Sequence, residues 1–377
     1  MGATDKETWD AYRRDELRRI QPLIESLGFV LDEKQVHTGG ERYLMMSARD
    51  VGGGGLKFVL TGKRTDDNKK VVIKVSREKD GILEIERERK ARQLLSTLPF
   101  AVWTFNIPQE LLFGRYGEYL LFVTEYIEQK IPLLARSLDE QFFMSLKAFE
   151  TQEGVHATTS QHSSAIRESF GMAGVKEYMT SMDSFVKHAR AYNPENTLLV
   201  STLIRARGFL LEHKTTIERY CGFLTHADFV PNNLRVREHT LYLLDYASLH
   251  FGNKYESWAR FLNYMVHHNP ALEHTLMDYV RANRGDEEYL SLRLMRVYKL
   301  AFLLQFWTSA LSHTSGNTHE LVMARVAFWT KVLNYILDDV SVPSSDVALI
   351  LEQEARLRTD EEKARQRELI GTRVGGF

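Results

Sequence analysis

The sequence predicts an α+β protein of two lobes, in which a small antiparallel sheet of five strands with one main helix precedes a larger, mostly helical lobe. Short runs rich in β-branched and aromatic residues, separated by glycine and polar turns, gather before residue 126. After residue 127, apolar residues recur at helical spacing instead. A chain of 377 residues is also long for a single hydrophobic core. We divide it into an N-terminal helical extension (1–28), a small lobe (29–126), a helical lobe (127–345) and a charged helical tail (346–377).

The charge balance gives no reason to expect a nucleic acid or a membrane as partner. The 49 basic and 50 acidic residues leave a formal net charge of -1, so a charged ligand must be met locally. The single cysteine, Cys221, excludes an internal disulfide and favours a reducing compartment. Residues 1–19 are too charged for a secretory signal, and no apolar run is long enough to cross a bilayer. We therefore expect a cytoplasmic protein, and the sequence leaves its oligomeric state open.

The extension and the small lobe are predicted to hold one helix each and the five strands. Apolar spacing predicts a helix from Thr8 to Leu27, interrupted at Pro22 and closed by Gly28. A second helix is expected from Asp80 to Leu98. The strands are expected at Tyr43 to Ala48, Leu56 to Leu60, Lys70 to Val75, Leu111 to Phe113 and Tyr119 to Glu125.

The large lobe is predicted to be helical apart from one hairpin. Leu234 to Val236 and Leu241 to Leu244 flank a polar turn, which is the spacing of a β-hairpin. Glu352 to Glu368 is dense in charge with little to bury, so we expect a peripheral helix there. The other helices are expected at Asp139 to Glu150, Ile166 to Ala191, Asn196 to Glu218, Tyr255 to His268, Leu272 to Arg281, Glu287 to His313 and His319 to Leu337.

Three oxygen-bearing side chains are expected to meet around the hairpin. Asp228 precedes Asn233 by five residues, and Asp245 follows the second strand. Because the hairpin doubles the chain back, Asp245 should return beside Asn233. Such groups around one point suit phosphoryl transfer, in which placing a metal and a hydroxyl group is most of the task.

The order His-x-Asp-x-x-x-x-Asn and then Leu-Leu-Asp resembles the catalytic and metal-binding loops of the aminoglycoside phosphotransferase and choline kinase family, whose fold resembles that of protein kinases. The residues are His226, Asp228, Asn233 and Asp245. The resemblance implies that Asp228 receives the proton of the acceptor hydroxyl or orients that hydroxyl. It also implies that Asn233 and Asp245 bind Mg²⁺ and that His226 positions the loop.

Lys74 is the one charge in the apolar strand from Val71 to Val75, and a buried ammonium group needs a partner. The helix that follows offers Glu84 and Glu88, one turn apart on the face expected to pack on the sheet. Glu88 is our first choice and Glu84 the alternative. The resemblance implies that Lys74 holds the nucleotide phosphates and that the glutamate orients the lysine.

Two glycine runs precede predicted strands, where backbone amides could cover the phosphates. Gly52, Gly53, Gly54 and Gly55 lie just upstream of Lys74 and are our first choice, with Gly39 and Gly40 as the alternative. The resemblance further implies that main-chain groups of Glu125 and Ile127, where the small lobe ends, meet the adenine edge.

Two positions depart from the family pattern. Ala227 stands where the family usually has glycine, which is a mild change. The segment from Tyr255 to Ala259 lacks the aspartate of the family's Tyr-x-Asp-Leu-Ala segment. The carboxylate expected to anchor the catalytic loop is therefore missing or shifted to Glu256.

We therefore expect a Mg²⁺-dependent kinase that transfers the terminal phosphate of ATP or GTP to a hydroxyl group of a small molecule. The alternative from another class is a regulatory nucleotide-binding protein without turnover, against which the joint presence of Lys74, Asp228, Asn233 and Asp245 argues. A protein kinase is less favoured, because the short stretch after Asp245 leaves no room for a long activation segment. The sequence leaves the identity of the acceptor open.

Overall fold

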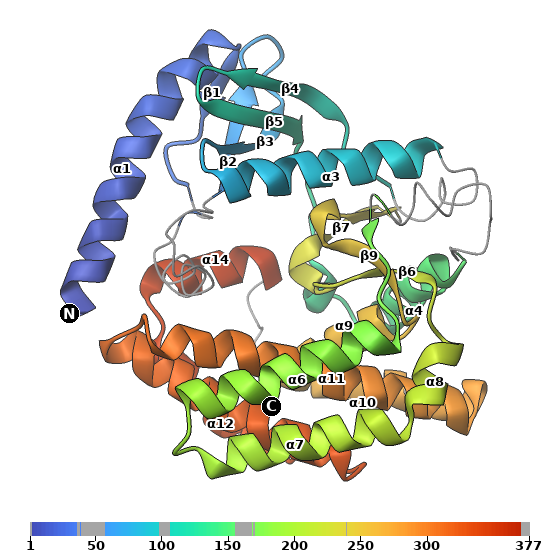
Figure 1. Ribbon diagram of the computed structural model, residues 1–377. Helices are drawn as coiled ribbons and strands as arrows, with labels where there is room; N and C mark the ends of the chain where they lie inside the picture. Colours follow the sequence, from blue (N-terminus) through green and yellow to red (C-terminus); the bar gives the residue numbers. More distant parts are fainter. Residues whose placement is uncertain are drawn as a thin grey trace.

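The computed structural model describes residues 2–35, 38, 57–97, 106–154, 168, 170–238 and 240–370. Both glycine runs, at residues 39–40 and 52–55, lie outside these described residues, as does the strand expected at 43–48. The architecture below therefore refers to the described ranges, which form two lobes (Figure 1).

The small lobe is built on a five-stranded antiparallel sheet, as predicted. Its strands lie in the order β1-β2-β3-β5-β4. β1 is an unexpected strand of three residues that pairs with the last three residues of β2, Gly62 to Arg64. The bounds are β1 (Phe29–Leu31), β2 (Phe58–Arg64), β3 (Lys70–Ser76), β4 (Glu110–Tyr116) and β5 (Tyr119–Glu125).

The two faces of this sheet have different roles. Helix α1 (Gly2–Ser26) continues through Pro22 and packs Ile20 and Ile24 against the apolar face of the sheet. Helix α3 (Lys79–Thr97) lies on the other face, where Ile85 packs on Phe122. Figure 1 shows α3 between the sheet and the large lobe. The face that carries α3 is therefore the face that meets the large lobe.

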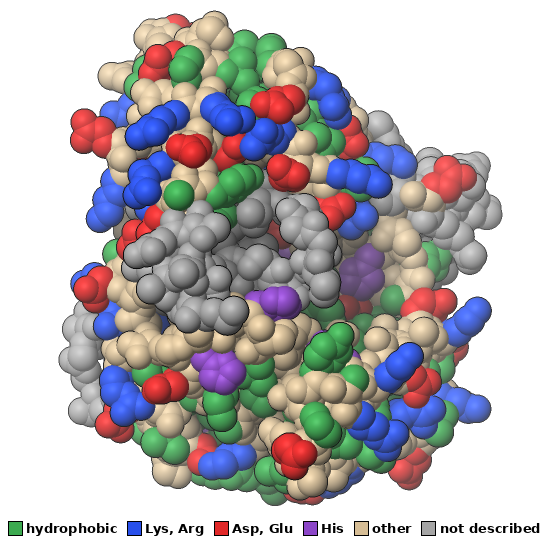
Figure 2. All heavy atoms as spheres, turned by 60° about the vertical axis from the view of Figure 1, so that its left-hand side comes forward, with side chains coloured by type: hydrophobic (Ala, Val, Ile, Leu, Met, Phe, Trp, Pro, Cys, Tyr) green, Lys and Arg blue, Asp and Glu red, His purple; other side chains and the backbone are tan. Residues whose placement is uncertain are grey.

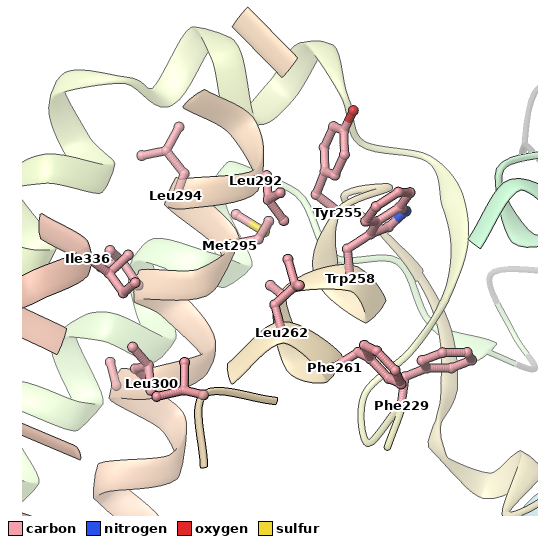
Figure 3. Packing of buried hydrophobic residues seen from close by; sticks show 14 of the residues in the cluster. Phe229, Tyr255, Trp258, Phe261, Leu262, Leu292, Leu294, Met295, Leu300 and Ile336 are labelled. Atoms are coloured by element: carbon pink, nitrogen blue, oxygen red, sulfur yellow. The ribbon is translucent and has the colours of Figure 1, made fainter. Parts of the chain in front are cut away.

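The large lobe is organised around helices α9 and α11, which supply most of the residues labelled in Figure 3. Trp258 of α9 stacks on Phe149 with ring centroids 4.0 Å apart. Burial of such apolar surface is the main source of stability in the lobe. Its helices are α4 (Leu138–Glu153), α6 (Val175–Tyr192), α7 (Thr197–Glu212), α8 (Lys214–Arg219), α9 (Glu256–His268), α10 (Pro270–Arg284), α11 (Asp286–Leu311) and α12 (Gly316–Leu337).

Two small antiparallel ladders interrupt the helices. The predicted hairpin is confirmed as β7 (Leu234–Arg237) and β8 (Thr240–Leu243), with Leu234 opposite Leu243. A second ladder, β6 (Phe223–His226) with β9 (Leu249–Gly252), was not predicted. Its strands are as short as β7 and β8, but no short polar turn joins them, and that turn is the signal that identified the hairpin. Two turns of 3₁₀ helix, η3 (Pro231–Asn233) and η4 (Tyr246–Ser248), lie next to the hairpin.

The charged C-terminal region forms two helices, α13 (Ser344–Leu357) and α14 (Asp360–Ile370), rather than one. The helix expected at Glu352 to Glu368 spans the end of α13 and most of α14, and it is not wholly peripheral, because Leu357 lies in a buried cluster with Leu321 and Val322. The start of α13, before that range, packs Val347 and Ile350 into the main core. Glu354 is also buried, where Arg325 Nε donates to it at 2.9 Å. Such ion pairs between distant segments allow a charge-dense helix to be buried, and composition alone does not reveal them.

The described surface carries charges of both signs. On the face drawn in Figure 2, basic and acidic side chains are interspersed, and neither sign forms a continuous patch. Among the helices that the structure describes, none combines the length and the apolar character needed to cross a bilayer.

Packing of α13 on the large lobe can be tested with two neighbouring residues. Ile350→Ala should destabilise the protein by about 2–5 kcal/mol, because it leaves a cavity in the core. Leu349→Ala should change stability by less than about 0.5 kcal/mol, because Leu349 is 50% exposed. Urea denaturation of both variants measures the difference. Equal effects of the two substitutions would contradict the docking of α13.

Candidate active site

The loop that carries Asp228 starts at the end of β6, and side chains of α9 bind it. Ser257 Oγ accepts a hydrogen bond from the His226 N–H at 2.8 Å and lies 2.8 Å from Thr225 Oγ1. The expected anchor, Glu256, points elsewhere: Tyr178 Oη donates to it at 2.7 Å and Lys299 Nζ at 2.6 Å. The anchoring carboxylate is therefore not shifted to Glu256, and a serine hydroxyl supports the loop instead.

His226 connects the Asp228 loop to the segment that carries Asp245. Its Nδ1 accepts from the N–H of Asp228 at 3.2 Å, so Nε2 carries the proton. Nε2 lies 3.0 Å from the carbonyl oxygen of Asp245 and 3.2 Å from that of Leu244. Burial lowers the pKa of His226. A neutral ring therefore ties the two acidic segments together, which is the positioning geometry expected from the sequence.

Asp228 lies at the surface of the junction, with 47% of its side chain exposed. Arg260 of α9 donates from Nε to Asp228 Oδ1 at 2.9 Å. Burial is the largest single effect and raises the pKa of the Asp228 carboxyl, but the charge and hydrogen bond of Arg260, together with His226, lower the pKa below its ordinary value. Asn233 Nδ2 donates to the Asp228 carbonyl at 2.8 Å and to Oδ2 at 3.1 Å. Asp228 is thus an accessible, fixed carboxylate.

Asp245 lies deeper in the junction, in the left-handed region at φ 60° and ψ 55°. Non-glycine residues seldom adopt this conformation, and they often do so at functional sites. Burial raises the pKa of the Asp245 carboxyl, but the charges of Lys57 and Lys74 outweigh this effect and lower it to about 2. Ser248 Oγ donates to Oδ2 at 3.0 Å. The hairpin brings the segment beside Asn233, whose carbonyl accepts from the Leu244 N–H at 2.8 Å.

The small lobe brings two lysine–glutamate pairs to this junction. Lys74 Nζ binds Glu88, and the two side chains are 13% and 3% exposed. Of the two glutamates left open by the sequence, Glu88 is therefore the partner of Lys74. Glu84 binds Lys57, whose Nζ also lies 3.9 Å from Asp245 Oδ1. Burial alone would lower the pKa of Lys57, but Asp245 and both glutamates raise it to about 12.

The segment expected to meet the adenine edge lies where β5 ends. The Glu125 N–H donates to the Gln109 carbonyl at 2.9 Å, so this amide is already occupied. The Ile127 N–H makes no hydrogen bond to the part of the chain that the structure describes. Ile127 is 4% exposed. Of the two amides, only that of Ile127 is left to bind a ligand within the described ranges.

Asn233 and Asp245 fit a magnesium ion that is shared with phosphate oxygens. Asp245 Oδ1 is buried and has no hydrogen-bond partner among the described residues. The Asn233 amide nitrogen donates to Asp228, and its side-chain oxygen accepts no hydrogen bond from a described residue, so this oxygen is available to a metal. Across those same residues, no group of three or more His, Cys, Asp or Glu could hold a metal alone. Mg²⁺ in kinases needs only one or two protein ligands, because phosphates and waters complete its shell.

Sequence reasoning missed three residues of the site. Lys57 lies in the apolar run from Leu56 to Leu60, which is the same signal that identified Lys74. Ser257 and Arg260 occupy ordinary helical positions, and only the fold brings them to the loop. Two further side chains of the large lobe have structural roles: Trp258 is 1% exposed in the core, and Glu273 binds the buried Arg296.

Comparisons with known proteins rest on structure, since no family model and no curated protein matches the sequence. Macrolide 2'-phosphotransferase type I has a TM-score of 0.54 at 15% identity, covering 83% of this chain and 97% of that one. A thermostable mutant of aminoglycoside phosphotransferase APH(4)-Ia with ADP and hygromycin B has a TM-score of 0.53 at 12% identity, covering 80% and 99%. APH(2")-IIia with GDP and kanamycin has a TM-score of 0.50 at 15% identity, covering 83% and 97%.

At these identities the likeness shows the fold. The chain has the protein-kinase-like fold of small-molecule phosphotransferases, over nearly the whole length of the solved structures it matches. The predicted bilobal α+β fold is therefore confirmed.

Ser257→Ala tests the support of the Asp228 loop. The buried N–H of His226 loses its acceptor, so the substitution should cost about 1–3 kcal/mol of stability. Ser201→Ala, at an exposed position on α7, should change stability by less than about 0.5 kcal/mol. Urea denaturation measures both. Ser257→Ala with wild-type stability would show that the hydroxyl does not anchor the loop.

The neutral state of His226 predicts a pH dependence of stability. Because folding lowers its pKa, the unfolded chain takes up a proton more readily as the pH falls below about 6.5. The stability that His226 contributes should therefore be lost on going from pH 7.5 to pH 5.5. His226→Gln keeps a donor toward the two carbonyl groups but does not titrate. The difference in free energy of unfolding between wild type and variant should shrink over this range, and a constant difference would contradict a buried neutral ring.

Proposed function

We propose that the protein is a Mg²⁺-dependent kinase that transfers the terminal phosphate of ATP or GTP to a hydroxyl group of a small molecule. The observation that carries the proposal is the meeting of the Lys74–Glu88 pair with Asp228, Asn233 and Asp245 at one junction between the lobes. The protein-kinase-like fold supports it. We also keep the predicted cytoplasmic location as part of the proposal.

Each residue has a distinct task in this reaction. Lys74, oriented by Glu88, offsets the negative charge of the nucleotide phosphates. Asp228 accepts a hydrogen bond from the acceptor hydroxyl and holds its oxygen in line with the terminal phosphate. Since Arg260 keeps the pKa of Asp228 low, the carboxylate acts mainly by orienting the hydroxyl. The Asp228 carboxylate takes the hydroxyl proton late in the reaction, because a loose transition state needs little help from a base.

Residues of the chain are also available to bind the metal and the base of the nucleotide. Asn233 and Asp245 would hold Mg²⁺, which when bound neutralises charge on the phosphate oxygens. The Ile127 amide, and a main-chain group of Glu125, would meet the edge of the base. Whether the base is adenine or guanine stays open. The neighbours of similar fold support either choice, since one was solved with ADP and another with GDP.

The acceptor is proposed to be a small molecule rather than a protein. After Asp245 the chain passes through η4 and β9 directly into α9, all within described residues. A protein kinase has a long activation segment at this place. Neighbours of similar fold bind hygromycin B or kanamycin or are named for a macrolide. These complexes support a small-molecule acceptor here.

Asp228→Asn tests turnover against the alternative of a regulatory nucleotide-binding protein. ADP or GDP release would be screened over amino sugars, amino alcohols, sugars and nucleosides with a coupled assay. The variant should lose about 10²–10⁴-fold in kcat, because the amide cannot accept the proton. Its affinity for Mg²⁺–nucleotide should stay within about twofold, since Asp228 is not a metal ligand in this account. Asp278→Asn, on the surface of α10, serves as the control.

A protein that binds Mg²⁺–nucleotide yet releases no diphosphate with any acceptor would favour the regulatory alternative. Failure to bind any nucleotide would contradict both the kinase function and the regulatory alternative.

Arg260 should set the acid limit of the activity. Removing its charge in Arg260→Ala raises the pKa of Asp228, so the carboxylate is protonated at higher pH. The acid limb of the kcat/KM profile should therefore move to higher pH, while Arg260→Lys should move it less. Profiles measured from pH 5 to 9 would check this. An unchanged limb in Arg260→Ala would mean that Asp228 does not control it.

A further inference from the structure

Lys57 is a buried cation that the proposed reaction has not yet used. It stands immediately before β2, and its side chain is only 12% exposed. Its Nζ binds Glu84 of α3 in the small lobe and lies 3.9 Å from Asp245 Oδ1 in the large lobe. Lys57 therefore touches one carboxylate of its own lobe and faces a proposed metal ligand of the other.

Lys57 and Lys74 lie on the same face of the sheet. Val59 is directly opposite Lys74 in the β2–β3 register, and Lys57 precedes Val59 by two residues. Because side chains alternate along a strand, Lys57, Val59 and Lys74 share one face, with the lysines as diagonal neighbours. Their partners Glu84 and Glu88 lie one turn apart on α3. Two lysine–glutamate pairs thus lie side by side next to Asp245.

A structural role alone does not account for the second pair. The Lys74–Glu88 pair and the packing of Ile85 on Phe122 already join α3 to the sheet. Burying a further ammonium group costs desolvation energy that an ion pair often fails to recover. At 3.9 Å, the Asp245 oxygen is beyond hydrogen-bond distance from Lys57. The ammonium is therefore close to the carboxylate without being fixed on it.

The position of Lys57 matches the place where phosphate charge would lie. A nucleoside triphosphate brings several negative charges to the site, and they are offset by metal and by lysine or arginine. Lys74 approaches this place from β3 and Lys57 from the start of β2, which are adjacent strands, and both lysines do so from the same face of the sheet. Both lysines act electrostatically on Asp245.

We propose that Lys57 is a second phosphate-binding lysine of the nucleotide site, held in place by Glu84 as Lys74 is held by Glu88. The inference rests on the proposed kinase function. When Mg²⁺–nucleotide binds, the Lys57 ammonium group would turn from Asp245 to a phosphate oxygen, which would leave the Asp245 carboxylate to hold the metal. No bond is made or broken at Lys57.

Two variants separate phosphate binding from a structural ion pair. Lys57→Met removes the ammonium group, whereas Glu84→Gln breaks the same ion pair but keeps the ammonium. Lys63→Met, an exposed lysine on β2, is the control for loss of a charge from that strand. Both site variants should fold, because methionine fills the volume of the lysine stem and Glu84 is 39% exposed; thermal melting verifies this.

The measurement is the affinity for adenosine, ADP and AMP-PNP with Mg²⁺, or for the guanine series if guanine is preferred. Lys57→Met should weaken AMP-PNP binding by about tenfold or more. Adenosine binding should change by less than about twofold, because no phosphate is present. Glu84→Gln should lose less than about threefold for AMP-PNP, and Lys63→Met should match wild type.

Equal losses in Lys57→Met and Glu84→Gln, or equal losses for adenosine and AMP-PNP, would overturn the inference in favour of a structural pair. So would AMP-PNP binding at wild-type strength in Lys57→Met. These results leave the proposed kinase function standing. Failure of the wild-type protein to bind any Mg²⁺–nucleotide would instead refute the kinase function, and the role of Lys57 with it.

Discussion

The carboxylate of Asp245, with 28% of its side chain exposed and Oδ1 buried, sets the main physical constraint on the junction between the lobes. A charge held away from water is tolerated only when opposite charges balance it, because its desolvation cost is several kcal/mol. The balance comes from the other lobe, where Lys57 and Lys74 are held by Glu84 and Glu88. The charge arrangement therefore couples the sheet, α3 and the hairpin segment. It also leaves one buried Asp245 oxygen without a hydrogen bond from the described chain, in the position that a metal would take.

The large lobe has the complementary task of holding Asp228 still while leaving it accessible. The residue that follows it, Phe229, is fully buried and packs near Phe261 of α9, as Figure 3 shows. Ser257 and Arg260 contact the loop from the same helix. Ser257 binds the backbone N–H of His226, and Arg260 binds the carboxylate of Asp228. His226 then joins this loop to the Asp245 segment. A helix rigidly packed in the core thus fixes both acids, which is the preorganisation that phosphoryl transfer needs.

Local signals in the sequence predicted a large part of this arrangement. Lys74 stood out because a single charge in an apolar strand needs a partner, and Glu84 and Glu88 were the candidates because both lie on the packed face of the next helix. The structure selects Glu88, which was the first choice. The hairpin was readable because a polar turn separated two apolar runs. The spacing of Asp228, Asn233 and Asp245 then followed from chain reversal.

What the sequence did not reveal depends on contacts between distant segments. The β6–β9 ladder pairs two strands of four residues that no short polar turn joins. Ser257 replaced the expected carboxylate, and nothing in its helical setting identifies it as an anchor. Buried ion pairs such as Glu354 with Arg325 brought a charge-dense helix into the core. Each case is settled by tertiary packing, which overrides composition and local pattern.

The central claim is that side chains from both lobes converge on one metal–phosphate site. Electron spin resonance of bound Mn²⁺, as a substitute for Mg²⁺, tests it directly in the presence of a non-hydrolysable nucleotide. The account predicts one Mn²⁺ ion that binds only with nucleotide, shows hyperfine coupling to phosphorus, and is lost in Asp245→Asn. Mn²⁺ that binds without phosphorus coupling, or equally well in Asp245→Asn, would contradict it.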